Sequence, residues 1–509
     1  MKSLPFRTLL ALLTASTSLS SVAQTQRLEL PDMGASAETI LSRKEEEEYA
    51  KALVRQMRAY EVLVEDPLIA DYFEDMGYRL ASNSDRPDKS FTFVVLNQPV
   101  VNAFAAPGGV IALYTGLILA ADDEHEVAGV LSHEIAHITQ LHLYRAFENQ
   151  KAATIPIALA MLGLVLAGGG SGEAIQGALI GGQAAAVQAR INFTRQNEYE
   201  ADRIGITTLS RAGYDPAGMG EFFEKMGRIT RAMGEGPPEY LRTHPVSVSR
   251  IAEADNRAAT MPKPPPSDSH DFLLVQARLR VLVEKSPDTA LKWFNARGDE
   301  AELTPAERDA VLYGTALALQ RKGEYEEARA LLESLQERSP HRAFELQLAD
   351  LDLDAGYDAA ALERLSDLYQ TFPGNHAISM QYAEALLKNR DPQQASTAAV
   401  VLRQQLLRRS QDPQLYELYA RSANVAGEPV RAREAIAETY YLRGSVHEAA
   451  MQLQDLLETE ELDYYERARI TARINELRLE LAKSGEDTPP QKEKRLKQAP
   501  VNDARSFLK

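Results

Sequence analysis

The segment LSHEIAHI, residues 131–138, carries two histidines four residues apart and a glutamate directly after the first. On an α-helix, residues i and i+4 share a face, so His133 and His137 can direct their imidazoles at one metal ion. Glu134 lies one residue further round the helix, within reach of a water molecule on that metal. A buried helix that holds two histidines for packing would show the same pattern. A third ligand is therefore needed to decide between the two interpretations.

The segment NEYEADRIG, residues 197–205, offers the acidic groups that such a site needs. A catalytic zinc takes three protein ligands and keeps one position for water. Glu198 is the predicted third ligand. Asp202, on the same helical face, is predicted to accept a hydrogen bond from the second nitrogen of a ligand histidine. Glu200 lies on another face and is a weaker candidate, and a solvent-facing acidic turn is the alternative for the whole segment.

Two further histidines require a decision. His244, in the segment RTHPV, is the candidate that supports an oxyanion formed in a zinc-dependent hydrolysis. It could instead fill the open position of the zinc in a resting state, and a loop histidine that caps the following helix is the third possibility. His142 follows His133 by nine residues, half a turn out of helical phase, and is not predicted to join the site.

The elements expected to position these side chains are a long helix and a small sheet. Apolar residues at three- and four-residue spacing predict a helix from about Gly116 to Leu143. Residues 91–96 and 110–114 are rich in β-forming residues, and the PGG sequence at 107–109 is a strong turn signal between them. An extended edge beside the zinc helix could pair with a substrate backbone. The residues predicted for that edge are Asn102, Ala103, Phe104 and Ala105.

The composition excludes several classes of protein. A chain of 509 residues is expected to form two or three domains. The formal net charge of −17 argues against a protein that binds nucleic acid. The chain has no cysteine, so disulfides cannot stabilise it and any metal ligands must be His, Asp or Glu.

The first residues have the form of a secretory signal. Lys2 and Arg7 precede a short apolar run, and small residues stand at Ser21 and Ala23. This pattern predicts a signal peptide over residues 1–23, cleaved after Ala23, and hence an exported protein.

An apolar segment rich in Gly and Ala follows the predicted zinc helix, over about residues 154–189. Its two apolar runs, over about residues 154–167 and 174–189, are each too short and uneven to predict a membrane span. A buried helical hairpin is one interpretation. The other is an apolar flap that covers the cleft or makes a peripheral contact with a membrane or a substrate protein.

The second half of the chain contains a repeat. Ala316, Gly323, Ala328 and Pro340 recur 33 residues later, and looser copies follow. The spacing is typical of tetratricopeptide repeats, which stack into an α-solenoid. We therefore predict a domain that holds the zinc site over 24–260, a proline-rich linker over 261–269, a helical repeat domain over 270–484 and a disordered tail over 485–509.

Together these motifs resemble the M48 family of zinc metallopeptidases. The match rests on HEIAH at 133–137, on Glu198-x-x-Ala-Asp202 and on NAFAxPGG at 102–109, and it covers about residues 45–255. The resemblance implies a mainly α fold with a small β-sheet, of the zincin type, and one Zn²⁺ per chain. It places the zinc ligands on His133, His137 and Glu198 and the general base on Glu134.

Within that family, the exported members with a C-terminal tetratricopeptide array are the closer match. Their resemblance implies a periplasmic endopeptidase with chaperone-like activity. It also implies the outer-membrane β-barrel assembly machinery as partner and unfolded or stalled outer-membrane proteins as substrates. The alternative is a repeat-based chaperone or adaptor with a latent or structural zinc site. The presence of Glu134 disfavours it, because a structural site needs no base beside its ligands.

Overall fold

The computed structural model describes residues 42–147, 194–233, 238–265, 267, 269–459 and 461–484. The predicted signal peptide, the apolar segment at 154–189 and the predicted C-terminal tail lie outside the described residues. Within the described ranges, no helix is both long enough and apolar enough to span a bilayer.

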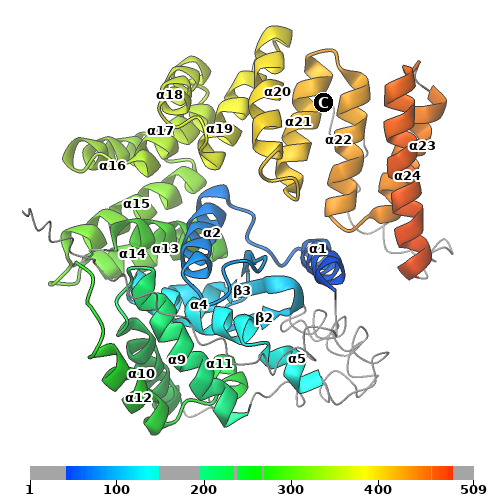
Figure 1. The fold of residues 1–509 in the computed structure, drawn as a ribbon. Helices are drawn as coiled ribbons and strands as arrows, with labels where there is room; N and C mark the ends of the chain where they lie inside the picture. Colours follow the sequence, from blue (N-terminus) through cyan, green and yellow to red (C-terminus); the bar gives the residue numbers. More distant parts are fainter. Residues whose placement is uncertain are drawn as a thin grey trace, which may run out of the picture.

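The described chain is mainly helical with one small sheet, which confirms the predicted fold class (Figure 1). The N-terminal part contains α1 (Arg43–Ala59), α2 (Pro67–Ser82), β1 (Thr92–Leu96), β2 (Ala103–Ala106), the 3-10 turn η2 (Pro107–Gly109), β3 (Val110–Tyr114), α3 (Thr115–Ala120), α4 (Glu124–Thr139), α5 (His142–Phe147), α9 (Arg195–Arg211), α10 (Gly218–Met233), α11 (Glu239–Thr243) and α12 (Val248–Ala258).

The C-terminal part is an array of helices. These are α13 (His270–Val283), α14 (Pro287–Gly298), α15 (Pro305–Lys322), α16 (Tyr325–Arg338), α17 (Arg342–Ala355), α18 (Asp358–Thr371), α19 (His376–Leu387), α20 (Pro392–Leu406), α21 (Pro413–Val425), α22 (Pro429–Leu442), α23 (Val446–Thr459) and α24 (Tyr464–Ser484).

The sheet has the strand order β1-β3-β2, with β1 parallel and β2 antiparallel to the central strand β3. Ala112 of β3 pairs with Val94 on one side and with Phe104 on the other. β2 is thus an edge strand, and no other strand among the described residues pairs with its outer side. The predicted turn is η2, where Gly109 has φ +79° and a Cβ would meet the Ser90 carbonyl oxygen at 1.9 Å.

The prediction of a single helix from Gly116 to Leu143 is wrong, because the segment forms three helices, α3, α4 and α5. Before α4, the Asp123 carboxylate accepts hydrogen bonds from the backbone N–H groups of His125 and Glu126, so it caps a new helix. After α4, Leu141 takes the left-handed φ of +57° and redirects the chain into α5.

The core of the N-terminal part surrounds α4, which packs against α2, α9, α10 and β2. Leu131 and Ile135 of α4 are fully buried in the core cluster that also contains Phe222 and Phe223 of α10. Gly205 of α9 faces the α4 backbone, and a Cβ there would lie 3.1 Å from the backbone nitrogen of His133. The absence of a side chain at Gly205 lets α9 approach α4 closely, which brings their polar residues within contact distance.

The C-terminal helices form stacked pairs whose small residues follow the predicted repeat. Gly323 and Gly356 end α15 and α17 with φ values of +88° and +82°, a backbone conformation that favours glycine. The alanines of the repeat are buried where the paired helices meet. They are Ala316, Ala328, Ala349, Ala361, Ala383, Ala395, Ala420, Ala432, Ala437 and Ala449.

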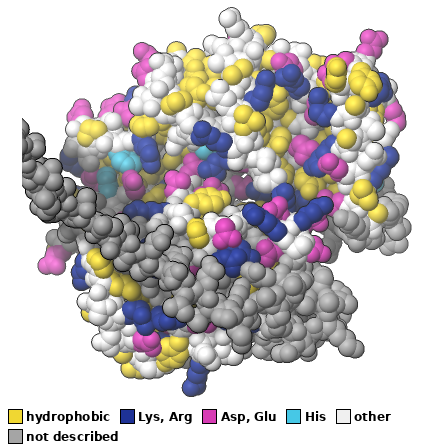
Figure 2. All heavy atoms as spheres, in the orientation of Figure 1, with side chains coloured by type: hydrophobic (Ala, Val, Ile, Leu, Met, Phe, Trp, Pro, Cys, Tyr) yellow, Lys and Arg dark blue, Asp and Glu magenta, His cyan; other side chains and the backbone are white. Residues whose placement is uncertain are grey.

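The array curves around α1 and α2, so the two parts of the chain share a contact surface (Figure 1). Ion pairs line this junction. Arg278 of α13 lies 2.8 Å from Asp66, and His376 of α19 lies 3.0 Å from Asp71. On the face shown in Figure 2, basic and acidic side chains are mixed over the described surface rather than separated into patches of one sign.

Candidate metal centre

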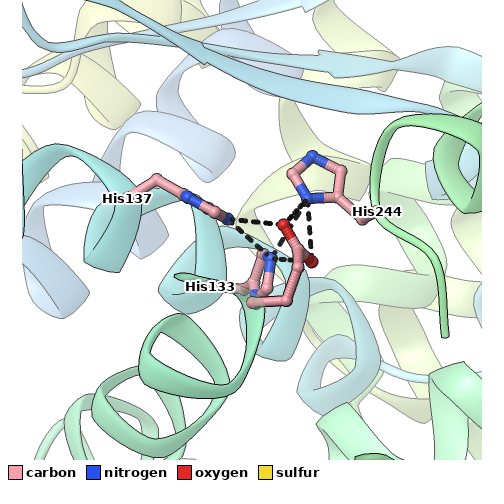
Figure 3. A group of neighbouring side chains, drawn as sticks. His133, His137 and His244 are labelled. Carbon is pink, nitrogen blue, oxygen red and sulfur yellow. Dashed lines mark hydrogen bonds and ion pairs between the residues drawn. The ribbon is translucent and has the colours of Figure 1, made fainter. Parts of the chain in front are cut away.

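Three side chains predicted as metal ligands converge in the interior of the N-terminal part. His133 and His137 project from α4, and Glu198 projects from the first turn of α9. None of the three is more than 2% exposed. Together with His244 they form a group whose ligand atoms all lie within 4.8 Å of one another. Figure 3 shows the three imidazoles directed at one point.

The nearest atoms of the group are nitrogen and carboxylate oxygen. The Nε2 atoms of His133 and His137 are 3.0 Å apart. Each lies 3.6 Å from a Glu198 carboxylate oxygen. Imidazole nitrogen and carboxylate oxygen are the donor atoms that catalytic zinc takes in proteins without cysteine ligands.

The hydrogen-bond pattern supports the fit of a cation to this group. His133 Nδ1 lies 2.9 Å from Asp202 Oδ1, and a carboxylate can only accept, so the ring proton belongs on Nδ1. The Nε2 lone pair then faces the lone pairs of His137 and Glu198. Three acceptors that converge in a buried space require a positive charge between them.

A proton is the smallest cation that could meet this need. Burial by itself lowers the pKa of His133, but the carboxylates of Asp202 and Glu198 outweigh it and raise the pKa to about 9. Burial likewise opposes the charge on Glu198, but the neighbouring histidines, His244 first, hold the pKa of that carboxyl well below its usual range. The site is therefore built to hold positive charge against an ionised glutamate.

Asp202 links the site to a buried arginine. Arg250 of α12 is 2% exposed and donates from Nε and Nη2 to the two oxygens of Asp202 at 2.6 and 2.8 Å. Its Nη1 lies 2.8 Å from Glu198 Oε2. One guanidinium therefore neutralises and orients both acidic residues that α9 presents to the histidines.

Glu134 lies fully buried next to the group, and neither of its oxygens meets a partner at hydrogen-bond geometry among the described residues. Burial raises its pKa, and the positive charge of His244 and His133 opposes that rise. A buried carboxylate without a firm hydrogen bond is available to receive a proton from a molecule that enters the site.

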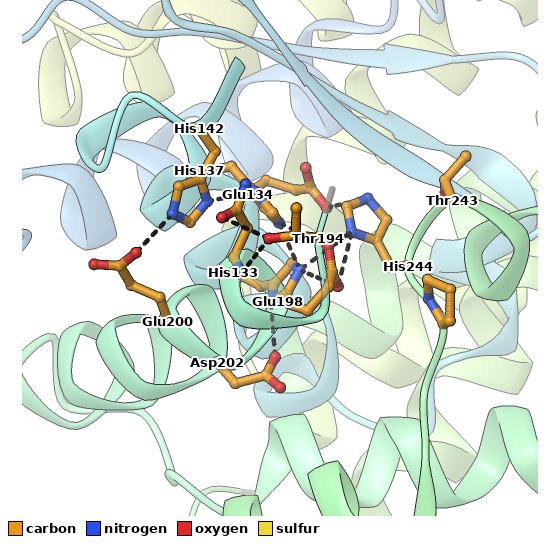
Figure 4. A network of polar contacts seen from close by, with 12 residues as sticks. His133, Glu134, His137, His142, Thr194, Glu198, Glu200, Asp202, Thr243 and His244 are labelled. Carbon is orange, nitrogen blue, oxygen red and sulfur yellow. Dashed lines mark hydrogen bonds and ion pairs between the residues drawn. The ribbon is translucent and has the colours of Figure 1, made fainter. Parts of the chain in front are cut away.

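His244 occupies the side of the group opposite α4 (Figure 4). Its Nδ1 lies 3.1 Å from Glu198 Oε1 and 3.3 Å from His133 Nε2, while its Nε2 lies 3.5 Å from Glu134 Oε1. The ring is 3% exposed and stacks on Tyr240. The structure therefore places His244 among the ligand atoms.

Comparison with known proteins identifies the family. Residues 67–258 match the model of peptidase family M48. The chain is 35% identical over 477 residues to the beta-barrel assembly-enhancing protease of Yersinia pestis, covering 92% of this chain and 97% of that one. The corresponding protein of Escherichia coli (strain K12) is 34% identical over 455 residues, covering 88% and 91%. The chain belongs to peptidase family M48.

A further relative is similar to only part of this chain. The mitochondrial metalloendopeptidase OMA1 of Arabidopsis thaliana is 34% identical over 170 residues, which cover 33% of this chain and 32% of that one. With the family established and the group of His133, His137 and Glu198 intact, this chain is an M48 metallopeptidase.

The edge strand of this M48 peptidase lies beside the metal centre. The predicted edge began at Asn102, and the strand itself runs from Ala103 to Ala106. The Asn102 side chain is buried and accepts a hydrogen bond from the Ala103 N–H. The backbone of Ala105 lies near Glu134 and lowers the pKa of that carboxyl, without reaching hydrogen-bond geometry. A cleft of about 230 Å³ lies along β2, and its lining includes Ala105, Gly108 and His137.

Two residues at this M48 site were missed by sequence reasoning. Arg250 carries no local motif, and only its contacts with Asp202 and Glu198 reveal it. Helical phase alone predicts that His142 lies outside the site, yet His142 is fully buried and its Nδ1 lies 2.9 Å from His137 Nδ1. The helix break at Leu141 cancels the phase argument, since His142 opens a new helix.

Proposed function

We propose that this M48 peptidase is an exported zinc endopeptidase that acts in the periplasm during assembly and quality control of outer-membrane β-barrel proteins. The observation that carries the enzymatic part is the convergence of His133, His137 and Glu198 beside the buried Glu134. Two full-length relatives are named for enhancing beta-barrel assembly, which supports the proposed substrate class. The signal pattern in residues 1–23 supports export.

The proposed zinc ligands are His133, His137 and Glu198. A zinc ion bound there supplies a Lewis acid that lowers the pKa of water to about 7 and polarises a peptide carbonyl. Glu134 is the general base: it removes a proton from the attacking water and delivers it to the leaving amine. Its carboxylate is buried and has no hydrogen-bond partner among the described residues, so both oxygens are free to take part in that transfer.

Asp202 and Arg250 orient the ligands. Asp202 Oδ1 lies 2.9 Å from the protonated Nδ1 of His133, and this contact keeps Nε2 directed at the metal. Arg250 holds Asp202 and Glu198 at a fixed separation through the planar fork of its guanidinium.

We assign His244 to the open position of the zinc in a resting state. Its Nδ1 is within 3.3 Å of both His133 Nε2 and Glu198 Oε1, closer than a group that contacts only the substrate's oxyanion would need to be. A substrate would have to displace this imidazole before its carbonyl could approach the group formed by His133, His137 and Glu198. The enzyme is therefore restrained until a substrate engages the cleft.

The substrate lies along β2. An extended peptide that pairs with the outer edge of this strand receives backbone hydrogen bonds regardless of its side chains, which suits cleavage of unfolded proteins. The cleft beside Ala105 leads to His137. Partner proteins of the assembly machinery are proposed to bind the helical array, whose stacked repeats offer an extended surface.

The test is cleavage of an unfolded outer-membrane β-barrel protein by the full chain, with zinc content measured in the same samples. We expect one zinc per chain in both wild type and Glu134→Gln. We expect cleavage by the wild type only, with a rate loss of about 10²–10⁴ in the variant. Wild type without zinc, or equal cleavage by both, would overturn the enzymatic proposal. Equal rates on a folded water-soluble protein would overturn the proposed substrate class.

A further inference from the structure

His142 connects a proposed zinc ligand to the surface of the N-terminal part. It is the first residue of α5 and is fully buried against α4. Its Nδ1 lies 2.9 Å from His137 Nδ1, and its Nε2 lies 3.1 Å from Glu200 Oε2. Glu200 in turn lies 3.6 Å from Arg145 Nη1. Figure 4 shows the three side chains of His137, His142 and Glu200 in one line.

The positions of the ring protons follow from these contacts. His137 offers Nε2 to the ligand group, so its proton stands on Nδ1 and is donated to His142. His142 accepts at Nδ1, and its own proton therefore stands on Nε2. That proton is donated to the Glu200 carboxylate, which can only accept. Each hydrogen bond then has one donor and one acceptor.

We infer that His142 and Glu200 are positioning residues for His137, which fix its ring orientation and keep the Nε2 lone pair directed at the metal. The inference rests on the proposed zinc site. It assigns the second ligand the same kind of support that Asp202 gives directly to His133. The difference is that an imidazole stands between ligand and carboxylate.

The geometry of α9 explains why an intermediate residue is needed. Glu198 and Asp202 lie one helical turn apart on the face toward α4, where they meet the histidines. Glu200 lies on another face of α9 and pairs with His142 and Arg145 of α5. His142 spans the gap between Glu200 and His137. A purely apolar packing role for His142 would not account for its two polar contacts, one with the His137 imidazole and one with the Glu200 carboxylate.

The experiment measures zinc affinity of the full chain by competition with a chromogenic chelator, and the absorption spectrum after Co²⁺ replaces zinc. The variants are His142→Leu, which removes both hydrogen bonds, and His142→Asn, whose amide oxygen can still accept from His137 Nδ1. Glu200→Ala removes only the outer contact. The control is His125→Leu, the same change on α4 at a ring that contacts Tyr214.

We expect His142→Leu to weaken zinc binding by about 10- to 100-fold and to change the Co²⁺ spectrum. His142→Asn should stay within about threefold of wild type, and Glu200→Ala should fall between the two. His125→Leu should bind zinc as wild type does. A wild-type zinc affinity in His142→Leu, or an equal loss in His142→Asn and His142→Leu, would overturn the inference.

The experiment distinguishes failure of the proposed function from failure of the positioning role. If His142→Leu does not fold, Glu200→Ala decides, since Glu200 is partly exposed and an unchanged zinc affinity there overturns the inference. If wild type binds no zinc, the proposed function fails. If wild type binds zinc and all variants bind it equally, only the positioning role fails.

Discussion

The Asp202 carboxylate lies 2.9 Å from His133 Nδ1 and receives two N–H groups of Arg250 on its other side. Asp202→Ala removes both contacts at once. We expect zinc affinity to fall by about 10- to 100-fold. We also expect the free energy of unfolding to fall by about 3–5 kcal/mol, because a buried charge loses its partner. Chelator competition and denaturant unfolding measure the two effects.

The control for this change is Asp85→Ala, which removes a half-exposed pair with Arg211 at the other end of α9. An exposed ion pair contributes at most about 1 kcal/mol, so this variant should bind zinc normally and unfold close to wild type. Equal zinc binding by Asp202→Ala and wild type would contradict the assigned role of Asp202.

Replacing His244 tests the resting state. If its imidazole occupies the open zinc position, His244→Ala frees that position. We then expect kcat/KM on an unfolded barrel protein to rise about tenfold, which corresponds to about 1.4 kcal/mol. A fall in kcat/KM would support oxyanion stabilisation instead, and an unchanged rate would exclude both roles. His125→Ala is the matched control on α4.

The edge strand can be tested at Ala105, whose backbone lies near Glu134 and lowers the pKa of that carboxyl, so its N–H faces the site. Ala105→Pro removes that N–H. A net hydrogen bond contributes about 1 kcal/mol, so kcat/KM should fall at least about fivefold while zinc content stays constant. Ala105→Ser keeps the N–H and should cleave as wild type does. Equal loss in both variants would mean that the side chain matters rather than the backbone donor.

His376 lies in α19, away from the metal centre, and its surroundings should make the stability of the protein depend on pH. Burial lowers its pKa, but Asp412 at 3.2 Å and Asp71 at 3.0 Å outweigh burial and raise the pKa to about 9. Arg409 faces Asp71 at 2.8 Å, and Arg58 adds positive charge near Asp412. A raised pKa in the folded state means that the stabilisation is complete below about pH 6.5 and is lost as pH rises through about 9.

We therefore expect wild type to lose on the order of 3 kcal/mol of unfolding free energy between pH 6.5 and 9.5 through this group. His376→Gln should lose less over the same range, and the difference between the two curves isolates the imidazole. His447→Gln, at an exposed position of α23, is the control. Parallel curves for wild type and His376→Gln would contradict the prediction.

The sequence predicted the parts of the site that depend on local spacing. His133 and His137 share a face because α4 is continuous between them, and Glu198 and Asp202 share a face because α9 is. The repeat was predictable for the same reason, since Gly323 and Gly356 mark the same turn in successive helix pairs.

The predictions that were wrong or missing depend on where helices end and on contacts between segments distant in sequence. His142 was excluded by counting residues along a helix that in fact ends at Thr139. Arg250 stands 48 positions after Asp202, and nothing in its neighbourhood indicates a partner there. Periodicity describes one element at a time, so it cannot show which elements meet.

α2 contacts both parts of the chain, so the stability of each part depends on the other. Ile69, Phe73 and Leu80 pack into the same core as α4, while Asp66 and Asp71 hold α13 and α19. Unfolding of either part would remove packing partners of α2 and expose the surface that the other part presents to it. The N-terminal part and the helical array should consequently unfold in a single calorimetric transition. No intermediate with a folded N-terminal part and an unfolded array is expected.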